Sequence, residues 1–387
     1  MDKSLFSSKS LGTLQRIRID DGHDWAFIPD PLPDKWDMPI QLWPLLSLAK
    51  EELARLDGVG RHMPGDSSNL LLTPLQKREA LKSSSLEGAY ATAEELLLFE
   101  KSPREPTSEH DKVNSWMEVR NYSRALQVGQ DLLLRLPLSI RLIREMHKEL
   151  LTGVRGANRN PGNFRINQVH IGSDRRFVPP PAGIAVECLQ QLEIQMNSDV
   201  TIDPLLYSFM VHYQFETIHP FSDGNGRVGR LLLSLMIFKR CNLVLPWLYL
   251  SEYFDRYKDE YVNNLFNVSV NADWKSYLEF CLRATVQQAR EAIVRFDSLV
   301  DIQRKYQKII ASSGGSARLS TIVESLFNVP FITIPDVREL LNTTYPTAKN
   351  DIERLISLQI LKPLARSEQR PKIFYAKEIF DVAYHGT

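Results

Sequence analysis

The segment from His219 to Arg230 constrains this chain more than any other part, because it gathers several kinds of reactive group into one short stretch. It reads HPFSDGNGRVGR and so combines a titratable base, a carboxylate, glycines on both sides of an asparagine, and two arginines. Gly224 and Gly226 stand just before residues 228–238, an apolar stretch of helical character. Glycine lets the backbone approach a ligand closely, and the N–H groups at a helix start attract anions. The segment therefore predicts a phosphate-binding loop that opens a helix.

The side chains of this loop fit chemistry at a phosphate group. Arg227 and Arg230 are three residues apart on one helix surface, and guanidinium groups pair well with phosphate oxygens. Asp223 offers hard oxygen ligands for a Mg²⁺ ion that bridges phosphates. His219 titrates near neutrality and can take a proton from an incoming hydroxyl. A lone histidine or an arginine pair is usually structural, but their combination predicts displacement at the α-phosphate of a nucleotide, with pyrophosphate as the leaving group.

The glycines of the loop also fit a different nucleotide motif. Gly224, Gly226 and Gly229 spell G-x-G-x-x-G, which marks a dinucleotide site only after a buried strand and with an acidic residue about 20 positions later. Residues 203–218 instead begin with Asp-Pro, which is typical of a helix start, and continue with apolar residues at helical spacing. No Asp or Glu occurs from 224 to 251. The sequence therefore excludes the dinucleotide interpretation.

The order H-P-F-x-D-G-N-G-R-x-x-R resembles, without a mismatch, the signature of the Fic family, which transfers AMP from ATP to protein hydroxyl groups. The resemblance covers about residues 30–300 and implies a mostly α-helical Fic-type core that uses ATP and Mg²⁺. It implies that His219 is the catalytic base and that Asp223 holds the metal ion. The resemblance further implies that the nucleotide is held by Asp223, Gly224, Asn225 (including its side-chain amide), Gly226, Arg227, Val228, Gly229 and Arg230.

A second segment, residues 164–178, predicts a β-hairpin. Phe164–Gly172 alternates in polarity and is rich in β-branched residues, and a Ser-Asp pair follows it. An ordinary surface hairpin is one interpretation; the other is the flap of Fic proteins, which the segment resembles by position. The flap holds a target protein by strand addition, so the partner implied is a protein with an acceptor hydroxyl. In that case the residues lining the nucleotide are Ile171, Gly172, Ser173 and Asp174.

Tyr261 resembles an aromatic residue that stacks near adenine in the family, where a second tyrosine often follows. Here the next residue is Val262, which departs from that pattern. A tyrosine in the hydrophobic core is the alternative interpretation.

An inhibitory motif is the third resemblance. Ser83, Glu87 and Gly88 fit the family pattern [S/T]-x-x-x-E-[G/N] within a predicted helix at about residues 74–90. Ser83 and Glu87 are four apart and so share a helix face, and glycine is common where helices end. A serine-rich helix end is the alternative. If Glu87 reaches Arg230, it neutralises the charge meant for the γ-phosphate, which implies an N-terminally self-inhibited enzyme.

The C-terminal part resembles a winged helix-turn-helix domain. Ser312–Ser316 has the composition of a flexible linker. Helices are expected at 319–327, 337–341 and 347–358, and a strand pair is expected at 361–365 and 372–375. The expected wing is basic through Lys362, Arg366, Arg370, Lys372 and Lys377. DNA binding and a protein or dimer contact both fit this pattern.

Composition sets the remaining expectations. Among 387 residues, 47 are Lys or Arg and 47 are Asp or Glu, so no net field attracts nucleic acid or membrane. The three cysteines lack metal or redox spacing and favour a reducing compartment. The most apolar stretch, 231–250, is interrupted by polar residues, so we expect a cytoplasmic protein without a membrane span. We expect three parts: an N-terminal inhibitory region (1–112), a catalytic core (113–311), and a linker with the winged helix (312–387).

The sequence leaves three functions open. We favour a protein adenylyltransferase that modifies a Ser, Thr or Tyr hydroxyl of a target protein and also its own chain, with a homodimer as a compatible assembly. A second function keeps the same fold and uses Glu87 to orient a water that removes AMP from a modified side chain. A third is a nucleotide-sensing regulator that binds DNA through its winged helix.

Overall fold

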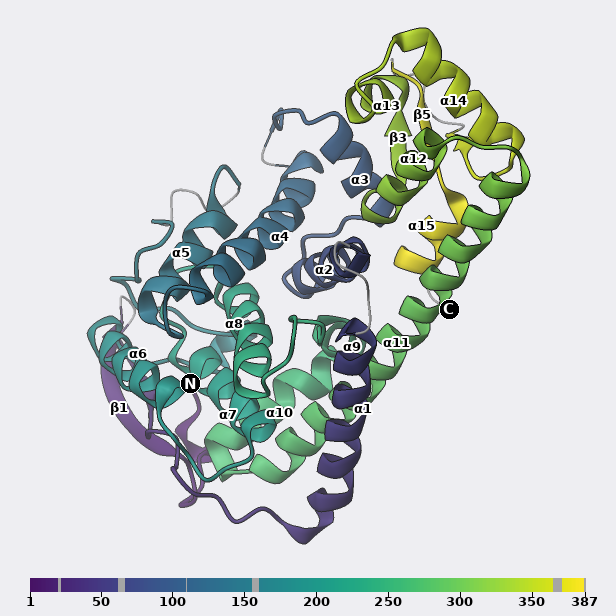
Figure 1. Ribbon diagram of the computed structural model, residues 1–387. Coiled ribbons are helices and arrows are strands. Elements are labelled where there is room, and N and C mark those ends of the chain that lie inside the picture. Colours follow the sequence, from purple (N-terminus) through teal and green to yellow (C-terminus); the bar gives the residue numbers. More distant parts are fainter. Residues whose placement is uncertain (20–21, 62–66, 109, 155–159, 365–370, 386–387) are drawn as a thin grey trace. The chain divides into compact units, whose positions relative to one another are not determined.

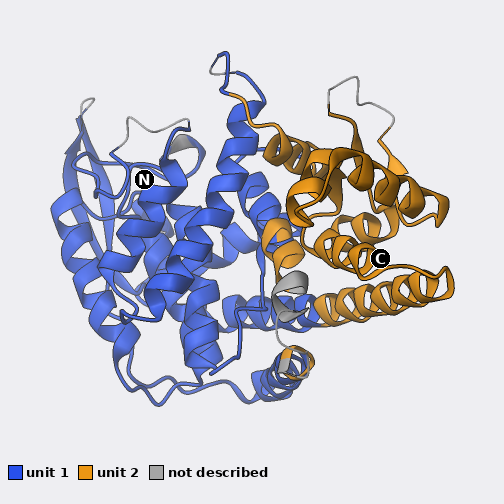
Figure 2. Cartoon of the chain, turned by 45° about the horizontal axis from the view of Figure 1, so that its top comes forward, with its two compact units in different colours: residues 1–57, 79–91, 105–289 blue, residues 58–78, 92–104, 290–387 orange. Residues whose placement is uncertain are grey.

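The computed structural model is mostly helical, as the sequence predicts (Figure 1). It describes the chain except for residues 20–21, 62–66, 109, 155–159, 365–370 and 386–387. The chain forms two compact units (Figure 2). Unit 1 comprises residues 1–57, 79–91 and 105–289, and unit 2 comprises residues 58–78, 92–104 and 290–387. The three-part division expected from the sequence stays a prediction.

Unit 1 contains most of the helices and one regular hairpin. Its elements are η1 (Lys3–Leu5), β1 (Gly12–Ile19), β2 (Gly22–Pro29), η2 (Ile40–Leu42), α4 (Val113–Leu133), α5 (Ile140–Leu151), η3 (Ser173–Arg175), α6 (Ala182–Asn197), α7 (Pro204–Ile218), α8 (Asn225–Arg240), α9 (Ser251–Arg256) and α10 (Lys258–Asn271). Three further helices are divided between the units, namely α1 (Trp43–Arg61), α2 (Ser67–Leu86) and α11 (Trp274–Ser312).

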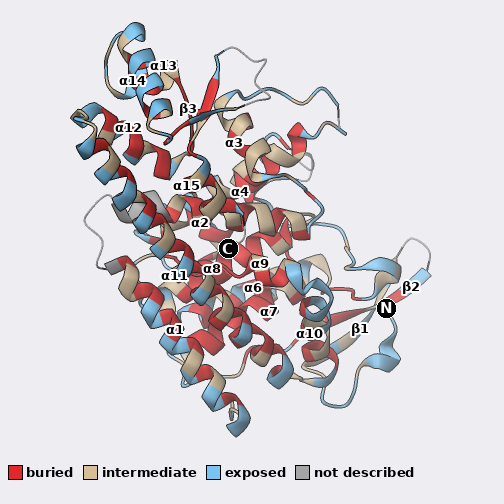
Figure 3. Ribbon diagram, turned by 90° about the vertical axis from the view of Figure 1, so that its right-hand side faces the viewer, coloured by how far each residue is buried: buried red, intermediate tan, exposed pale blue. Residues whose placement is uncertain are grey.

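Helices α7 and α8 pack against each other and form the centre of the unit 1 core (Figures 1 and 3). Nearly every residue of α7 is buried, including polar residues such as His212 and Gln214. The helix begins as the sequence predicts, because the Asp203 side chain accepts the N–H of Leu205 at 2.9 Å and Pro204 takes the first helical position. α4 packs against both α5 and α8. These contacts fix the chain on both sides of the loop between α7 and α8.

The regular hairpin of unit 1 lies near the N-terminus, where the sequence analysis predicted none. β1 and β2 pair antiparallel from Gly12 opposite Pro29 to Ile19 opposite Gly22. Ala26 and Phe27 of β2 are fully buried, and because consecutive side chains of a strand point to opposite faces, both faces of β2 are covered here. The Phe27 N–H also donates to the carbonyl of Val178 at 2.9 Å, which ties the hairpin to the end of the 164–178 segment.

The flap segment, 164–178, differs from the predicted hairpin. The chain reverses direction as predicted, and Ile171 and Phe177 form an antiparallel bridge with hydrogen bonds of 2.8 and 3.1 Å. The rest of the segment, all of which is described, forms no strand ladder, so the predicted extent of the strands is wrong. Side chains hold the two arms instead. Gln168, for example, donates its amide to one backbone carbonyl in each arm, at 3.0 and 2.9 Å.

Unit 2 contains α3 (Ala93–Lys101), α12 (Ala317–Asn328), β3 (Phe331–Thr333), α13 (Ile334–Leu340), α14 (Tyr345–Ser357), β4 (Lys362–Pro363), β5 (Ile373–Tyr375) and α15 (Lys377–Tyr384). Three helices and two strands lie where the sequence predicts them. The strands form an antiparallel sheet in the order β3-β5-β4. The winged-helix assignment stays a prediction, and Arg366 and Arg370 of the expected wing lie outside the described residues.

The predicted linker at Ser312–Ser316 joins α11 to α12, and its flexibility stays a prediction. α11 continues through Ser312, and the chain then turns directly into the next helix. Gly314 adopts a positive φ of 64°, and Gly315 donates its N–H to the carbonyl of Ile310 at 3.0 Å. Glycines suit a flexible linker, and the same residues also close a helix through a left-handed position, as Gly314 does here.

Among the described residues, the helices are all too short or too polar to cross a membrane.

Candidate active site

His219 stands where α7 ends. It adopts a left-handed conformation with φ 50° and ψ 60°, and its N–H donates to the carbonyl of Phe215 at 3.0 Å. The ring Nδ1 lies 3.2 Å from the backbone carbonyl of Glu216. Because a carbonyl only accepts, Nδ1 carries the proton and Nε2 is left unprotonated. Burial lowers the pKa of His219 to about 4, so the ring is neutral at pH 7 and Nε2 can accept a proton.

The loop after His219 is braced from within by Asn225. The side-chain Oδ1 accepts the N–H of Phe221 at 2.9 Å, and Nδ2 donates to the carbonyl of the same residue at 2.9 Å. The amide is thus engaged within the loop at both ends, and its predicted contact with a phosphate stays a prediction. The preceding residue, Gly224, adopts a left-handed conformation with φ 77°, which favours glycine.

A second brace comes from α5. His147 is fully buried, and its Nδ1 accepts the N–H of Gly162 at 2.8 Å. Nε2 therefore carries the proton and donates to the carbonyl of Asp223 at 3.1 Å. The ring also stacks on Phe221 with centroids 3.7 Å apart. Burial lowers the pKa of His147 to about 4, so this brace remains neutral near pH 7.

The first turn of α8 holds a carboxylate of the chain itself. Oε1 of Glu87 lies 2.8 Å from Nη2 of Arg230. A Cβ on Gly226 would lie only 2.3 Å from the same oxygen, so glycine at this position lets the carboxylate rest on the helix start. Burial raises the pKa of Glu87, but the Arg230 guanidinium outweighs burial and lowers it below its usual value. The helix start is therefore an anion site, and its anion is Glu87.

Ser83 binds the same guanidinium. Its hydroxyl accepts from Nε of Arg230 at 2.8 Å, and its backbone carbonyl accepts from Nη2 at 2.9 Å. The helix predicted at 74–90 ends one residue before Glu87, which lies in the turn that follows. Gly88 has φ 83°, the left-handed conformation expected at a helix end. The structure thus brings both residues of the predicted inhibitory motif to Arg230.

Arg227 has a different environment from Arg230. Its Nη1 donates to Glu118 of α4 at 3.0 Å, and both side chains are buried. Its Nη2 lies 3.8 Å from Oδ1 of Asp223, which accepts the N–H of Gly224 at 2.7 Å. The Arg227 side chain, predicted to bind phosphates, is thus anchored in the protein by Glu118.

Asp223 is the predicted metal ligand, and its side chain is 37% exposed. Among the described residues, no group of three or more His, Cys, Asp or Glu side chains is arranged to hold a metal ion. A metal ion at Asp223 would therefore take its other ligands from phosphates and water. This fits Mg²⁺, which commonly binds through one or two carboxylates and the phosphates of a substrate.

A further carboxyl group, Glu216, lies against α8. A Cβ on Gly229 would come within 2.1 Å of its Oε1, so the structure places this glycine, predicted to contact the nucleotide, against a carboxyl group. Oε1 is buried and has no hydrogen-bond partner among the described residues. Burial raises the pKa of Glu216 to about 7; Arg230 opposes this rise and Glu87 adds to it. Glu216 is therefore partly protonated at neutral pH.

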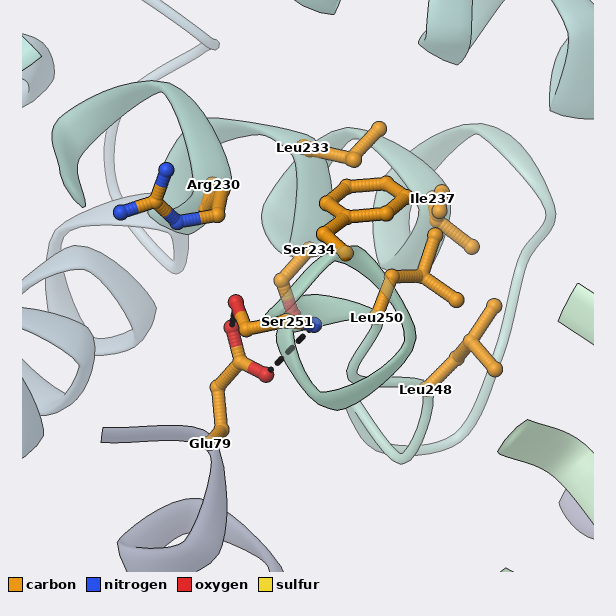
Figure 4. A pocket seen from close by; sticks show the side chains of 9 residues that line it. Glu79, Arg230, Leu233, Ser234, Ile237, Leu248, Leu250 and Ser251 are labelled. Atoms are coloured by element: carbon orange, nitrogen blue, oxygen red, sulfur yellow. Dashed lines mark hydrogen bonds between the residues drawn. The ribbon is translucent and has the colours of Figure 1, made fainter. Parts of the chain in front are cut away.

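A small cavity lies beside Arg230 (Figure 4). Its volume of about 10 Å³ suits one water molecule and is too small for a nucleotide. Glu79 borders it and accepts the N–H of Ser251 at 3.1 Å and the hydroxyl of Tyr122 at 3.0 Å. The hydroxyl oxygen of Ser234, also on the cavity wall, is buried without a partner among the described residues. The charge of Arg230 is thus flanked by buried polar groups.

The predicted flap contacts lie at the turn of the 164–178 segment. Ile171 is half-buried at the single bridge, and Gly172 and Ser173 are exposed. Gly172 has φ 79°, which allows the sharp turn. The side chain of Asp174 lies outside what is described. Their contact with a nucleotide stays a prediction.

Tyr261 lies in an aromatic stack of the core and is 4% exposed. Its ring is parallel to Phe254 with centroids 4.4 Å apart, and its hydroxyl lies 2.7 Å from Nε2 of His212. Adenine could stack on this face only if Phe254 moved away. Of the two interpretations drawn from the sequence, the geometry favours the core tyrosine.

Sequence reasoning missed several residues around the site. His147 and Glu216 are polar residues among the apolar residues of their helices. A polar residue at such a position is uncommon, so the sequence could have identified both as candidates for the site. Glu118 and Arg165 carry no such local signal, because their partners are far away in the sequence.

Comparison with known proteins agrees with this geometry. Residues 43–131 match the Fic/DOC family N-terminal region, and residues 137–237 match the Fic/DOC family. The chain contains a Fic domain. Protein adenylyltransferase Fic of Drosophila yakuba is 34% identical over 114 residues, and that of Drosophila melanogaster is 33% identical over 114 residues. Each match covers 29% of this chain and 22% of the relative, so the chain matches less than a quarter of the length of these relatives.

Solved structures share the fold of the Fic domain and its surroundings. A Fic family protein from Desulfovibrio desulfuricans G20 superposes with a TM-score of 0.57 at 20% identity, over 88% of this chain and 97% of that chain. Fic-1 from C. elegans (residues 134–508) superposes with a TM-score of 0.53 at 21% identity, over 66% of this chain and 76% of that chain. At this level of identity the similarity shows the fold alone.

Proposed function

We propose that this protein is an adenylyltransferase that transfers AMP from ATP to a hydroxyl group of a protein. The observation that carries the proposal is the carboxylate of Glu87 on the first turn of α8, with a neutral histidine at the start of the same loop. An anion site beside a base is what nucleotidyl transfer requires. The matched relatives are named protein adenylyltransferases.

In this proposal the triphosphate takes the place of Glu87. Arg230 loses its carboxylate partner and pairs with phosphate oxygens, and the backbone N–H groups at the start of α8 add further donors. Asp223 would hold Mg²⁺, which neutralises phosphate charge when bound. Arg227, anchored by Glu118, contributes positive charge at the same helix start. Each contact favours the charge that the leaving pyrophosphate develops.

The proposed chemical step is a displacement at the α-phosphorus. The acceptor hydroxyl gives its proton to Nε2 of His219, and its oxygen forms a bond to the α-phosphorus. The bond from that phosphorus to the bridging oxygen of the β-phosphate breaks, and pyrophosphate leaves. The Nδ1 proton of His219, held by the Glu216 carbonyl, keeps the ring in the tautomer that can act as a base.

The same contacts support self-inhibition. Glu87 and Ser83 together occupy Nε and Nη2 of Arg230, and Glu87 fills the space above Gly226. A γ-phosphate cannot share that space with a second anion. We therefore propose that the enzyme is restrained until Glu87 leaves, and that ATP before then binds without a productive pose.

The proposed partner is a protein segment with a Ser, Thr or Tyr hydroxyl, docked at the flap. The flap arms pair with each other at a single bridge, and an extended acceptor chain would pair with backbone groups along the flap. The protein itself is a candidate acceptor.

Purified protein with α-³²P-labelled ATP and Mg²⁺ tests the proposal. We expect the Glu87→Gly variant to become labelled, whereas γ-³²P-labelled ATP leaves it unlabelled, because AMP transfer keeps only the α-phosphate. The matched control is Glu87→Gly combined with His219→Ala, which should take up no label. Labelling from γ-³²P-labelled ATP without labelling from α-³²P-labelled ATP would indicate phosphoryl transfer and refute the proposal.

A further inference from the structure

Arg165 is a buried cation in the flap segment, and no ion pair is found for it among the described residues. Its side chain is 3% exposed. Burial lowers its pKa to about 10, and no acidic group opposes this. Burying a charge without an opposite charge is costly, so hydrogen bonds must compensate.

The hydrogen bonds of Arg165 join three parts of the site. Nε donates to the backbone carbonyl of His219 at 2.8 Å. Nη1 donates to the carbonyl of Asn167 at 3.1 Å, in the incoming arm of the flap, and Nη2 donates to the carbonyl of Pro180, just after the outgoing arm. The backbone N–H of Arg165 also donates to the carbonyl of Pro220 at 3.0 Å. One residue therefore connects both flap arms to the peptide that carries the proposed base.

Only arginine has the geometry for this set of partners. Its planar guanidinium presents donors in a fixed fork, whereas lysine offers one flexible point charge. The carbonyls that Arg165 reaches point from separate segments, so a lysine at 165 keeps the charge but cannot hold all of them. The flap arms pair with each other at a single bridge, while backbone hydrogen bonds to Phe27 and Pro220 attach the flap to the rest of unit 1.

We propose that Arg165 is a positioning residue that sets the flap, and with it the acceptor hydroxyl, against Nε2 of His219. The inference rests on the proposed adenylyl transfer and deepens it by naming the group that aligns acceptor and base. Arg165 touches neither the nucleotide nor the acceptor. It acts through the left-handed His219 peptide and through the flap arms. A misplacement of about 1 Å between reacting groups can cost about a hundredfold in rate.

The charge of Arg165 affects the pKa of His219, which a purely structural role would leave unchanged. Besides burial, Arg165 lowers the pKa of His219, whereas Glu87 and Asp223 raise it. Transfer requires neutral His219, so activity falls as the pH drops through that pKa. Removing the positive charge raises the pKa, and the acid limb of the pH–rate profile should move to higher pH.

The test uses the full chain carrying Glu87→Gly, with Arg165→Lys or Arg165→Met added. Arg240→Lys is the matched control, because Arg240 also donates to several backbone carbonyls, at 2.8 to 3.4 Å, but contacts none of the site residues. Automodification at saturating ATP, ATP affinity, and hydrogen exchange of residues 164–180 are measured for each. NMR titration of His219, assigned through His219→Ala, gives its pKa without any turnover.

We expect both Arg165 variants to lose at least about tenfold in rate with ATP affinity unchanged, and to exchange faster across the flap. Only Arg165→Met should shift the acid limb and the His219 titration upward, and Arg240→Lys should change none of these. Folded Arg165 variants with a parental rate and parental flap exchange would overturn the inference. If the Glu87→Gly parent transfers no AMP, the proposed function fails, and flap exchange with the His219 titration still decides the role of Arg165.

Discussion

The loop at 219–230 carries the proposed base, His219, and the flap at 164–178 contacts it through Arg165. The two segments differ in what stabilises them. The loop is fixed by its own residues, since the amide of Asn225 closes on Phe221 and α8 begins immediately. The two arms of the flap share one backbone bridge, and side chains and single backbone hydrogen bonds to other segments supply the rest of its support. A phosphate group is the same in every turnover and suits a rigid receptor. Acceptor segments vary, and a lightly held flap can adapt to them.

The largest expected effect concerns the base at the start of the loop. His219→Ala in the Glu87→Gly background should reduce AMP transfer at least about a hundredfold, because general-base catalysis contributes about that much. ATP affinity should be unchanged, because His219 faces the acceptor proton and not the phosphates. Transfer rates and ATP titration calorimetry on the same preparations test this. Full transfer by the variant at saturating ATP would refute the role of His219.

A pair of variants tests the contrast between loop and flap directly. Asn225→Ala removes both bonds that close the loop and should lower transfer at least about tenfold, because the phosphate site loses its geometry. Gln168→Ala removes a comparable pair of amide bonds from the flap. It should cost only about two- to fivefold and should increase hydrogen exchange at 164–180. Equal losses in the two variants would show that the flap is as rigidly required as the loop.

The proposed self-inhibition by Glu87 acts on Arg230 of α8 and should leave the flap unaffected. Glu87→Gly should raise automodification at least about tenfold, equivalent to about 1.4 kcal/mol, because Arg230 becomes available to the γ-phosphate. Glu260→Ala is the control, since it removes a carboxylate that lies 3.0 Å from another arginine, Arg283. If Glu87 instead orients a hydrolytic water, Glu87→Gly will lose AMP removal from modified protein while its transfer rate stays at the wild-type level.

Glu216 should make the stability of the protein depend on pH. Its pKa is raised to about 7 in the folded protein from 4.5, so the folded state binds the proton more tightly. The stabilisation from this proton is complete below pH 4.5 and is lost as the pH rises through 7. Glu216→Gln removes this dependence, so its stability relative to the wild type should improve by about 2 to 3 kcal/mol between pH 5 and pH 8. Thermal unfolding at both pH values measures the difference; parallel changes in the two proteins would contradict it.

The sequence predicts the parts of the site whose structure is local. The start of α7 at Asp203-Pro204, the glycine-rich start of α8 and the left-handed Gly88 each depend on neighbouring residues, and each was predicted correctly. The contact between Glu87 and Arg230 was also expected, but only through a family resemblance, because no local rule connects residues 143 positions apart.

Long-range interactions explain the remaining errors. The 164–178 segment alternates like a strand, but side chains from elsewhere, such as Arg165 reaching His219, replace its ladder. The β1–β2 hairpin went unpredicted because burial on both faces of β2, at Ala26 and Phe27, removes the alternation of polar and apolar residues that marks a half-buried strand.

The close approach of Glu87 to Gly226 also limits how regulation can be lost by mutation. Any side chain at 226 would expel the carboxylate, but it would equally obstruct a phosphate on the same turn. Hyperactive alleles should therefore map to residues 83–88 rather than to the loop, whose substitutions abolish restraint and activity together. A screen for gain of function would find a narrow target near the end of α2, and a screen for loss of function would find a broad one in the loop.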